Sequence, residues 1–409
     1  MRHFSRRAAV GTGLAGIASA QPIFALARGQ ATPAASPVAD PAQAIQDIAE
    51  ASMAELHLRA VLVHVMIDGE EIAHHAIGES MTGIPATPEM HVRNGAVAIT
   101  YTSALLLQLV DEGVLALDDT IDQWLPDLQD ADQVTLRMLA NMTSGYPDFV
   151  QNANFLRENI EDPFRAWTPD DQIEIGLSTP RVFAPGTNWD YSHTNYVILG
   201  LALEAATGEP LEALLKRYIL DPLNLTGTAS EQTGWMPDPV LHAYSSERRE
   251  QLGIPAGTRF YEESSFWNPS WTLARGSVQY STIADMTTSF AAIGRGELLS
   301  EASYGELTNR DLVGFGAPLE GCPNCFTLSA ARLYGLGIWM TGGWLLQNPL
   351  FSGYAGTTVY HPDSRIAIGV ATTFAEGAFD EHGAYGNGST TIAARIGNLL
   401  LPDDPLPGA

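Results

Sequence analysis

A serine nucleophile activated by a lysine is the first chemistry to consider, and the chain has a single lysine among 409 residues. The residue three positions before Lys216 is Ala213, so no Ser-x-x-Lys pair exists in which a lysine could activate a serine. His193 is a candidate general base, since imidazole transfers protons near neutral pH and Tyr191 lies two positions away. The alternative is a hydrogen-bonded structural histidine, because the sequence shows no acidic or metal-binding cluster that would orient the imidazole.

The two cysteines, Cys322 and Cys325, occur as Cys-Pro-Asn-Cys in a stretch rich in glycine and proline. In an exported protein we expect a local disulfide. A redox-active pair needs a strand-to-helix context that this loop lacks, and zinc needs two more ligands, whereas no histidine lies near in sequence. The histidines show no His-Glu-x-x-His or comparable spacing. We therefore predict no metal and no organic cofactor.

The net negative charge of the chain argues against nucleic acid as a partner. The chain has 47 acidic and 21 basic residues and a formal net charge of -26. Nucleic-acid affinity rests on lysine and arginine neutralising phosphates, so we predict no nucleic-acid partner. The hydrophobic content of 45% and the length predict a globular fold with a substantial core.

The N-terminal 27 residues resemble an export signal, with basic Arg6 and Arg7, an uncharged stretch and Ala25-Leu26-Ala27 as a cleavage site. The paired arginines indicate the twin-arginine route. We predict an extracellular or periplasmic protein, attached to a membrane only if this signal is retained. Residues 28–41 are predicted to be a disordered linker, 42–401 the folded domain and 402–409 a tail.

Hydrophobic periodicity gives the order of the elements that must position these groups. Helical spacing from residue 45 to 56 precedes two β-rich runs, 59–67 and 70–77, joined by the turn signal Asp68-Gly69. A buried helix is predicted from about residue 96 to Gly113. Residues 118–300 are mostly helical in pattern, strands return at 333–339, 356–360 and 366–373, and Ser389 is the predicted cap of a final helix.

Three parts of the chain resemble the superfamily of serine β-lactamases and penicillin-binding proteins, which includes D-alanyl-D-alanine carboxypeptidases. They are LLLQLVDEGVLALDDTIDQWLP with LRMLANMTSGYPD (105–126 and 136–148), FAPGTNWDYSHTNYVILGLALEAATGEPLEALLKRYILDPLNLTGT (183–228) and FSGYAGTTVYHP (351–362). The resemblance implies an α/β (α+β) fold of the β-lactamase/transpeptidase type. An antiparallel sheet flanked by helices would comprise residues 42–95 and 330–401, and a mostly helical lobe would comprise 96–329.

The resemblance also assigns site positions. The nucleophile position falls on Ala96 and its lysine on Ile99, whereas the tyrosine of the second motif is retained as Tyr191, with His193 where asparagine is usual. Phe351 takes the place of the lysine or histidine that opens the third motif. Backbone N–H groups, of Ala96 and Tyr354, would still form a carbonyl-binding cradle. The implied binding cleft includes Ser192, Phe351, Ser352, Gly353 and Tyr354.

These substitutions predict an exported, β-lactamase-related protein that lacks serine acyl transfer and retains its cleft for a small-molecule or peptide-like ligand. An apolar ligand is favoured because the two expected cations are replaced by Ile99 and Phe351. The alternative is an active hydrolase of esters, amides or lactams that uses Tyr191 and His193. Arg93 and Arg275 are the cations that could still reach the cleft, and hydroxyl groups on the same helix are candidate substitute nucleophiles: Thr100, Tyr101 and Ser103.

Overall fold

The computed structural model describes residues 40–407. The predicted export signal, residues 1–27, and nearly all of the predicted linker lie outside the described residues. Within residues 40–407, no helix combines the length and the apolar character that a membrane span requires.

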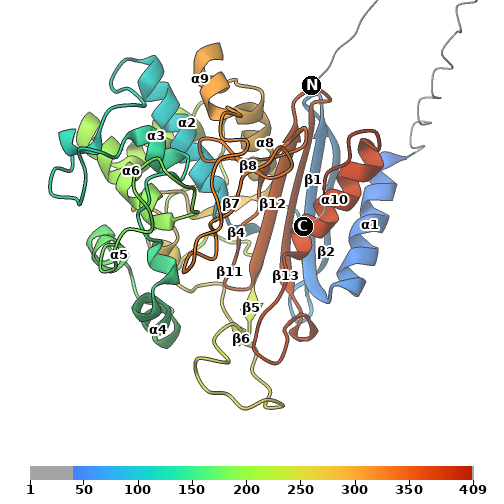
Figure 1. Ribbon diagram of the computed structural model, residues 1–409. Helices are drawn as coiled ribbons and strands as arrows, with labels where there is room; N and C mark the ends of the chain where they lie inside the picture. Colours follow the sequence, from blue (N-terminus) through green and yellow to red (C-terminus); the bar gives the residue numbers. More distant parts are fainter. Residues whose placement is uncertain (1–39, 408–409) are drawn as a thin grey trace, which may run out of the picture. The chain divides into compact units, whose positions relative to one another are not determined.

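The centre of the fold is a nine-stranded antiparallel sheet in the order β3-β2-β1-β13-β12-β10-β9-β8, with β11 paired to β12 outside this path (Figure 1). Asp68 and Gly69 form the tight turn between the first two strands, both with positive φ, as an Asp-Gly pair predicts. The strands are β1 (Leu58–Ile67), β2 (Glu70–Met81), β3 (Ile84–Pro85), β8 (Leu333–Tyr334), β9 (Trp339–Thr341), β10 (Trp344–Gln347), β11 (Leu350–Phe351), β12 (Tyr354–His361) and β13 (Ile366–Phe374).

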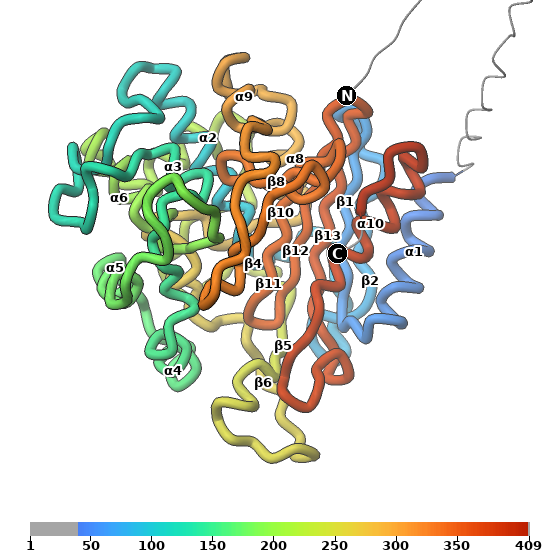
Figure 2. Tube along the Cα trace, viewed as in Figure 1, coloured from blue at the N-terminus to red at the C-terminus, as the bar shows by residue number. Residues whose placement is uncertain are grey.

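Helices cover both faces of this sheet. α1 (Pro41–Glu55) and α10 (Gly388–Leu400) pack on one face, and α8 (Ile283–Gly294) packs on the other (Figures 1 and 2). Successive side chains of β1 alternate between the faces: Val61 and Val63 belong to the core beneath α1 and α10, whereas Ala60 and Leu62 belong to the larger core around α8. The predicted fold class, an antiparallel sheet with flanking helices and a mostly helical part, is confirmed.

The middle of the chain forms the helical part. α2 is buried along most of its length and lies at the centre of this part, as its apolar sequence predicts. The remaining elements are α2 (Val97–Asp111), α3 (Leu136–Ala140), α4 (Ala153–Glu161), α5 (Pro169–Gly176), α6 (His193–Thr207), α7 (Leu211–Leu215), α9 (Glu301–Leu307) and the short strands β4 (His91–Arg93), β5 (Tyr244–Ser245), β6 (Glu262–Glu263) and β7 (Tyr280–Thr282).

The cap of the final helix differs from the prediction. Asn387, and not Ser389, precedes α10, and its side-chain oxygen accepts the Thr390 N–H at 3.2 Å. Ser389 lies inside the first turn and donates its hydroxyl to the same oxygen at 2.6 Å. Both residue types favour N-cap positions, so the choice was decided by where the preceding loop turns into the helix.

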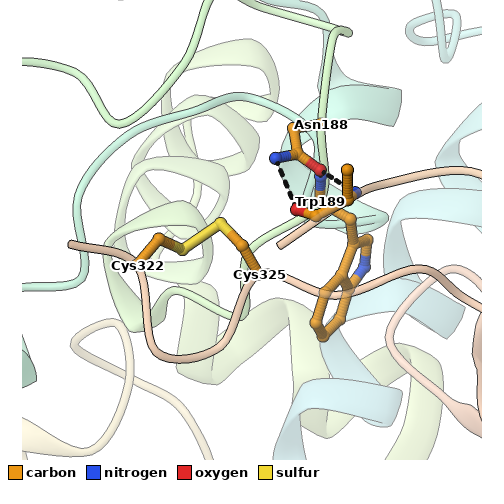
Figure 3. Close-up of a disulfide and its surroundings, with 5 residues drawn as sticks. Asn188, Trp189, Cys322 and Cys325 are labelled. Atoms are coloured by element: carbon orange, nitrogen blue, oxygen red, sulfur yellow. Dashed lines mark hydrogen bonds between the residues drawn. A yellow bond between two sulfur atoms is a disulfide. The ribbon is translucent and has the colours of Figure 1, made fainter. Parts of the chain in front are cut away.

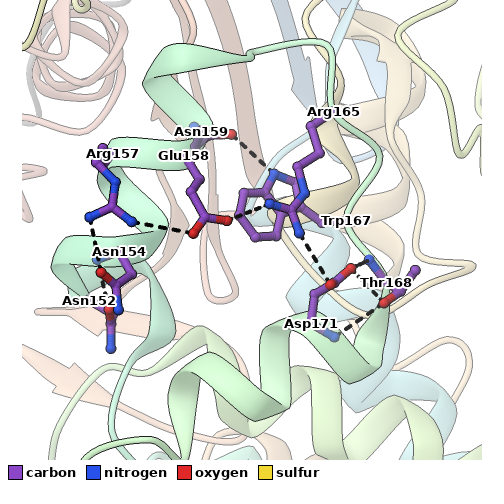
Figure 4. A network of polar contacts seen from close by, with 9 residues as sticks. All are labelled: Asn152, Asn154, Arg157, Glu158, Asn159, Arg165, Trp167, Thr168 and Asp171. Carbon is purple, nitrogen blue, oxygen red and sulfur yellow. Dashed lines mark hydrogen bonds and ion pairs between the residues drawn. The ribbon is translucent and has the colours of Figure 1, made fainter.

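A polar network fixes the junction between α4 and α5 (Figure 4). The Arg165 guanidinium pairs with Glu158 at 2.5 Å and with Asp171 at 3.2 Å, and its central carbon lies 3.9 Å from the Trp167 ring centroid. Trp167 in turn belongs to a small core with Phe149, whose ring lies 6.2 Å from that of His193. The network therefore supports the start of α6.

Candidate functional site

His193 begins α6 and is held there by a carboxylate. Asp148 accepts the His193 backbone N–H at 3.1 Å, and both of its oxygens lie 3.2 Å from the His193 Nδ1 atom. Because a carboxylate can only accept, Nδ1 is the nitrogen that donates to Asp148, and in the neutral imidazole Nε2 would be the accepting nitrogen. The expectation that no acid orients this imidazole is therefore wrong. Asp148 was visible in the sequence as the last residue of the segment SGYPD. Its proximity to His193, 45 positions away, depends on the fold.

His193 lines a cavity of about 340 Å³ between the start of α2 and the strands β9, β10 and β11. Its walls come from segments that lie far apart in the chain. The lining residues are Gly95, Ala96, Ile99, Trp189, Tyr191, His193, Trp271, Thr272, Leu273, Asn324, Phe326, Arg332, Trp339, Gln347, Asn348, Pro349, Leu350 and Phe351.

The three positions at which apolar residues replace the expected nucleophile and cations meet in this cavity. Ala96, Ile99 and Phe351 all line it, and none of them has a hydroxyl or amino group. Phe351 is packed tightly, since a Cβ atom added to Gly95 would lie 2.8 Å from its Cε1 atom and 2.4 Å from Pro349 Cβ. The cavity floor is thus apolar where an acyl-transfer site would carry a nucleophile and cations.

Tyr191 lies beside His193 as a neutral phenol. Its ring stacks on Trp339 with a centroid distance of 6.4 Å and an interplanar angle of 11°, and it meets the His193 ring edge-on at 5.3 Å. Burial raises the pKa of Tyr191 well above its ordinary value, and the charge of Asp148 raises it further. Tyr191 can therefore donate a hydrogen bond to a ligand, but it cannot supply a phenolate at neutral pH.

Aromatic rings form the remaining walls, and most of them, Trp271, Phe326 and Trp339, come from segments distant from Tyr191 in the sequence. Trp189 packs against Phe326 at 5.0 Å and Trp339 at 5.5 Å between ring centroids. At the rim, the Arg332 guanidinium lies 4.0 Å from the Phe326 ring centroid, within range of a cation–π interaction. Arg332 thus supplies a cation that the sequence analysis missed.

The predicted Cys322–Cys325 disulfide is present and shapes this rim (Figure 3). It closes a short loop that contains Asn324, and this residue and Phe326, which follows the loop, line the cavity. The Asn188 side chain anchors the same segment, because it accepts the Ala317 N–H at 2.8 Å and donates to the Ala317 carbonyl at 3.1 Å. Trp189, the next residue, is thereby held against the loop.

Of the predicted cleft residues, only Phe351 lines this cavity. Ser192 is fully buried, and Ser352 and Gly353, both with positive φ, form the turn between β11 and β12. Ser352 lines a separate cavity of about 210 Å³ that shares Phe351 with the first. Tyr354 is buried in the sheet and donates its hydroxyl to the Leu241 carbonyl at 2.6 Å.

The substitute nucleophiles and cations considered from sequence lie elsewhere. The Thr100 hydroxyl donates to the Gly337 carbonyl at 2.7 Å, and the Ser103 hydroxyl bonds to Tyr196 at 2.7 Å, both within the core. Tyr101 is likewise buried and bonded to Ser289 at 2.6 Å. The two arginines do not line the cavity: Arg93 is buried against backbone carbonyls, and Arg275 is exposed and pairs with Glu204 at 3.8 Å.

A second carboxyl group, that of Asp190, lies close behind the site. Asp190 is 7% exposed, and one of its oxygens lies within 4.8 Å of both sulfur atoms of the disulfide. Burial raises the pKa of Asp190 to about 7, with the Asp148 charge as a second cause. Ionising Asp190 therefore works against folding.

We predict that Asp190→Asn raises the free energy of unfolding at pH 8. A carboxyl group whose pKa rises from about 3.9 in the unfolded chain to about 7 in the folded one costs up to about 4 kcal/mol above pH 7. This cost vanishes below about pH 4, so the advantage of the variant should shrink as the pH falls. Urea unfolding of the variant and the wild type from pH 4 to pH 8.5 measures this difference in the free energy of unfolding. Asp127→Asn, at an exposed position, is the control and should show no such pH-dependent difference. A pH-independent difference would contradict the assignment.

Comparison with known proteins agrees with this architecture. Residues 45–389 match the family model described as Beta-lactamase. Esterase EstB of Burkholderia gladioli is 27% identical over 66% of this chain and 74% of its own length. Penicillin-binding protein 4 of Amycolatopsis lactamdurans is 31% identical over 48% of this chain, which spans half of that protein.

Solved structures show the same fold. D-amino acid amidase from Ochrobactrum anthropi SV3, in complex with L-phenylalanine amide, superposes with a TM-score of 0.73 over 89% of this chain and 99% of its own, at 22% identity. The sheet with its helical part, the meeting of Ala96, Tyr191 and Phe351 at one cavity and the match over most of the chain agree with one another. This chain belongs to the beta-lactamase family.

Proposed function

We propose that this protein is exported and binds a small-molecule or peptide-like ligand non-covalently, without forming an acyl-enzyme. The observation that carries this proposal is the convergence of Ala96, Ile99 and Phe351 on one cavity. Loss of a serine nucleophile elsewhere costs on the order of 10^6 in turnover, whereas a shaped cavity still binds. The basic residues and cleavage motif at the N-terminus support export.

The lining residues define the ligand chemistry. Aromatic walls formed by Trp189, Trp271 and Trp339 favour a ligand with a planar apolar group. Gln347 donates to the Thr100 hydroxyl at 3.2 Å and is committed to the core, whereas Tyr191 and His193 present polar groups to the cavity, with Arg332 at the rim. A cavity of about 340 Å³ suits a ligand at the small end of the drug-like range.

A second function is favoured by one specific observation, the His193–Asp148 pair. With Nδ1 bonded to the carboxylate at 3.2 Å, His193 Nε2 could accept a proton from water as that water attacks an ester, amide or lactam carbonyl. No covalent intermediate is needed on this route. The esterase and the penicillin-binding protein among the relatives support testing such carbonyl substrates.

One experiment separates the two functions. Aryl esters, amides and lactams are assayed for turnover and, by calorimetry, for binding, using the wild type, His193→Ala, Asp148→Asn and Tyr191→Phe. We expect saturable binding of aromatic compounds without turnover. Turnover that falls by about 10^2- to 10^4-fold in both His193→Ala and Asp148→Asn would establish the hydrolase instead.

A matched control guards this test against general effects of removing a histidine. His242 pairs with Glu263 outside the cavity, so His242→Ala should change neither binding nor turnover. Intact-mass measurement after incubation with a penicillin-type probe completes the experiment. Stoichiometric labelling of the wild type would contradict the non-covalent proposal.

A further inference from the structure

Two histidines and a glutamate gather on the sheet, away from the cavity. His64 lies on β1 and faces His74 directly across the pair on β2, with ring centroids 4.8 Å apart. Glu71, near the start of β2, is paired with Met66 of β1. None of these three residues lines the cavity that contains His193, so this cluster is separate from the candidate functional site.

An irregularity in the strand brings the glutamate to this face. Residues three apart on a regular strand, such as Glu71 and His74, point to opposite faces of the sheet. The register between β1 and β2 shifts between Val65 and Met66, so that Ala73 faces Val65 while Glu71 faces Met66. Since Met66 and His64 share a face, the bulge places Glu71 on the face of both histidines. Sequence spacing alone therefore predicted no metal here.

The distances within the cluster match those between neighbouring ligands of one ion. His64 Nε2 lies 3.1 Å from Glu71 Oε2, and His74 Nδ1 lies 3.5 Å from the same oxygen. All three ligand atoms lie within 4.8 Å of one another. Zinc bonds of about 2.0–2.2 Å at tetrahedral angles separate neighbouring ligand atoms by about 3.3 Å. Small shifts of the exposed glutamate would thus allow all three atoms to bind one ion.

Burial and exposure also suit a metal site. His64 is 3% exposed, so the surrounding core fixes the position of its imidazole. The Glu71 side chain is 57% exposed, so an ion can enter from solvent and keep water in its remaining positions. Imidazole and carboxylate ligands together suit zinc among the abundant divalent ions.

We propose that His64 Nε2, His74 Nδ1 and the Glu71 carboxylate bind one Zn²⁺ ion that ties β2 to β1. The segment of β2 from Glu70 to Gly78 pairs with β1, whereas the pairing of β2 with β3 involves only Glu79 and Met81 of β2, so this end of β2 is an edge of the sheet. An ion held by ligands from both strands would hold this edge in register. Its role is structural and does not involve the cavity.

The test uses untagged protein freed of metal with a chelator and then titrated with ZnCl₂ by calorimetry at pH 7.5. We expect one Zn²⁺ per chain, a Zn²⁺-dependent rise in the unfolding temperature, and at least about a tenfold loss of affinity in His74→Gln and in Glu71→Gln. These two variants are chosen because both side chains reach solvent, whereas replacing buried His64 endangers folding.

A control comes from a looser cluster of the same residue types. His382 is exposed and lies 3.8 Å from Glu250 and 3.6 Å from Glu381, so His382→Gln should keep full affinity. Co²⁺ gives a second readout, as its visible absorption should appear in the wild type and be lost in His74→Gln. Absence of binding, affinity unchanged in both site variants, or affinity lost in His382→Gln would overturn the proposal and leave a hydrogen-bonded histidine–glutamate group.

Discussion

The double substitution Ala96→Ser with Ile99→Lys is expected to make the protein react covalently with a penicillin-type probe, whereas the wild type stays unlabelled. Ala96 is the N-cap of α2 and Ile99 lies in its first turn, and both line the same cavity as Tyr191, so the new hydroxyl and amine would be added to that cavity. Intact-mass measurement checks this result, with peptide mapping to locate the adduct at position 96. The label should be absent from Ala96→Ser alone if a nearby lysine is needed to activate the hydroxyl.

This restoration has a cost in stability. Ile99 is 1% exposed, so an ammonium group there loses hydration, and we expect the double variant to be less stable by roughly 2–4 kcal/mol. Phe351 packs against Gly95 and narrows the approach to position 96, so adding Phe351→His should speed labelling. If the double and triple variants fold, as judged by circular dichroism, yet neither is labelled, the placement of the acyl-transfer positions is wrong.

Trp189→Ala is expected to be the most damaging single substitution in the cavity wall. Trp189 is 1% exposed and packs against the rings of Phe326, Tyr334 and Trp339. Removing a buried tryptophan costs roughly 3–5 kcal/mol, and here the new void would open into the cavity and weaken ligand binding as well. Urea unfolding measures the loss of stability, and calorimetry with the best aromatic ligand measures the loss of binding.

Two further variants make this prediction specific. Trp235 is 55% exposed, so Trp235→Ala should change the free energy of unfolding by less than about 0.5 kcal/mol. Trp189→Phe keeps a ring in the wall and removes an indole N–H that has no hydrogen-bond partner within residues 40–407. It should therefore cost less than Trp189→Ala. Equal costs for Trp189→Ala and Trp235→Ala would show that the aromatic wall does not contribute to stability.

Much of the fold could be predicted from local patterns. The Asp68-Gly69 turn, the buried α2 and the strands β12 and β13 follow from turn chemistry and hydrophobic periodicity, which depend on neighbouring residues only. The cap of α10 was misplaced by two residues because Asn387 and Ser389 have similar capping preferences. The local disulfide could also be predicted, since a separation of three residues keeps the two sulfur atoms close.

The candidate site was predicted less completely, because its members come from segments far apart in the chain. Tyr191 and His193 were found through a motif, but Asp148 reaches His193 only when the α3–α4 connection packs against the start of α6. Arg332, Trp271 and Trp339 belong to no motif, so only the packed structure shows that they line one cavity with Trp189.

The sequence by itself determined which side chains are absent, since it has no Ser-x-x-Lys pair and has alanine at position 96 and isoleucine at position 99, and residue identities do not depend on the fold. The tertiary structure decided which groups act together. It brought the Asp148 carboxylate within hydrogen-bond distance of the His193 imidazole. A β-bulge brought Glu71 next to His64 and His74. The physical reason is that hydrogen bonding and metal coordination act over about 2–3.5 Å, a proximity that long-range packing and strand register create and that sequence spacing does not encode.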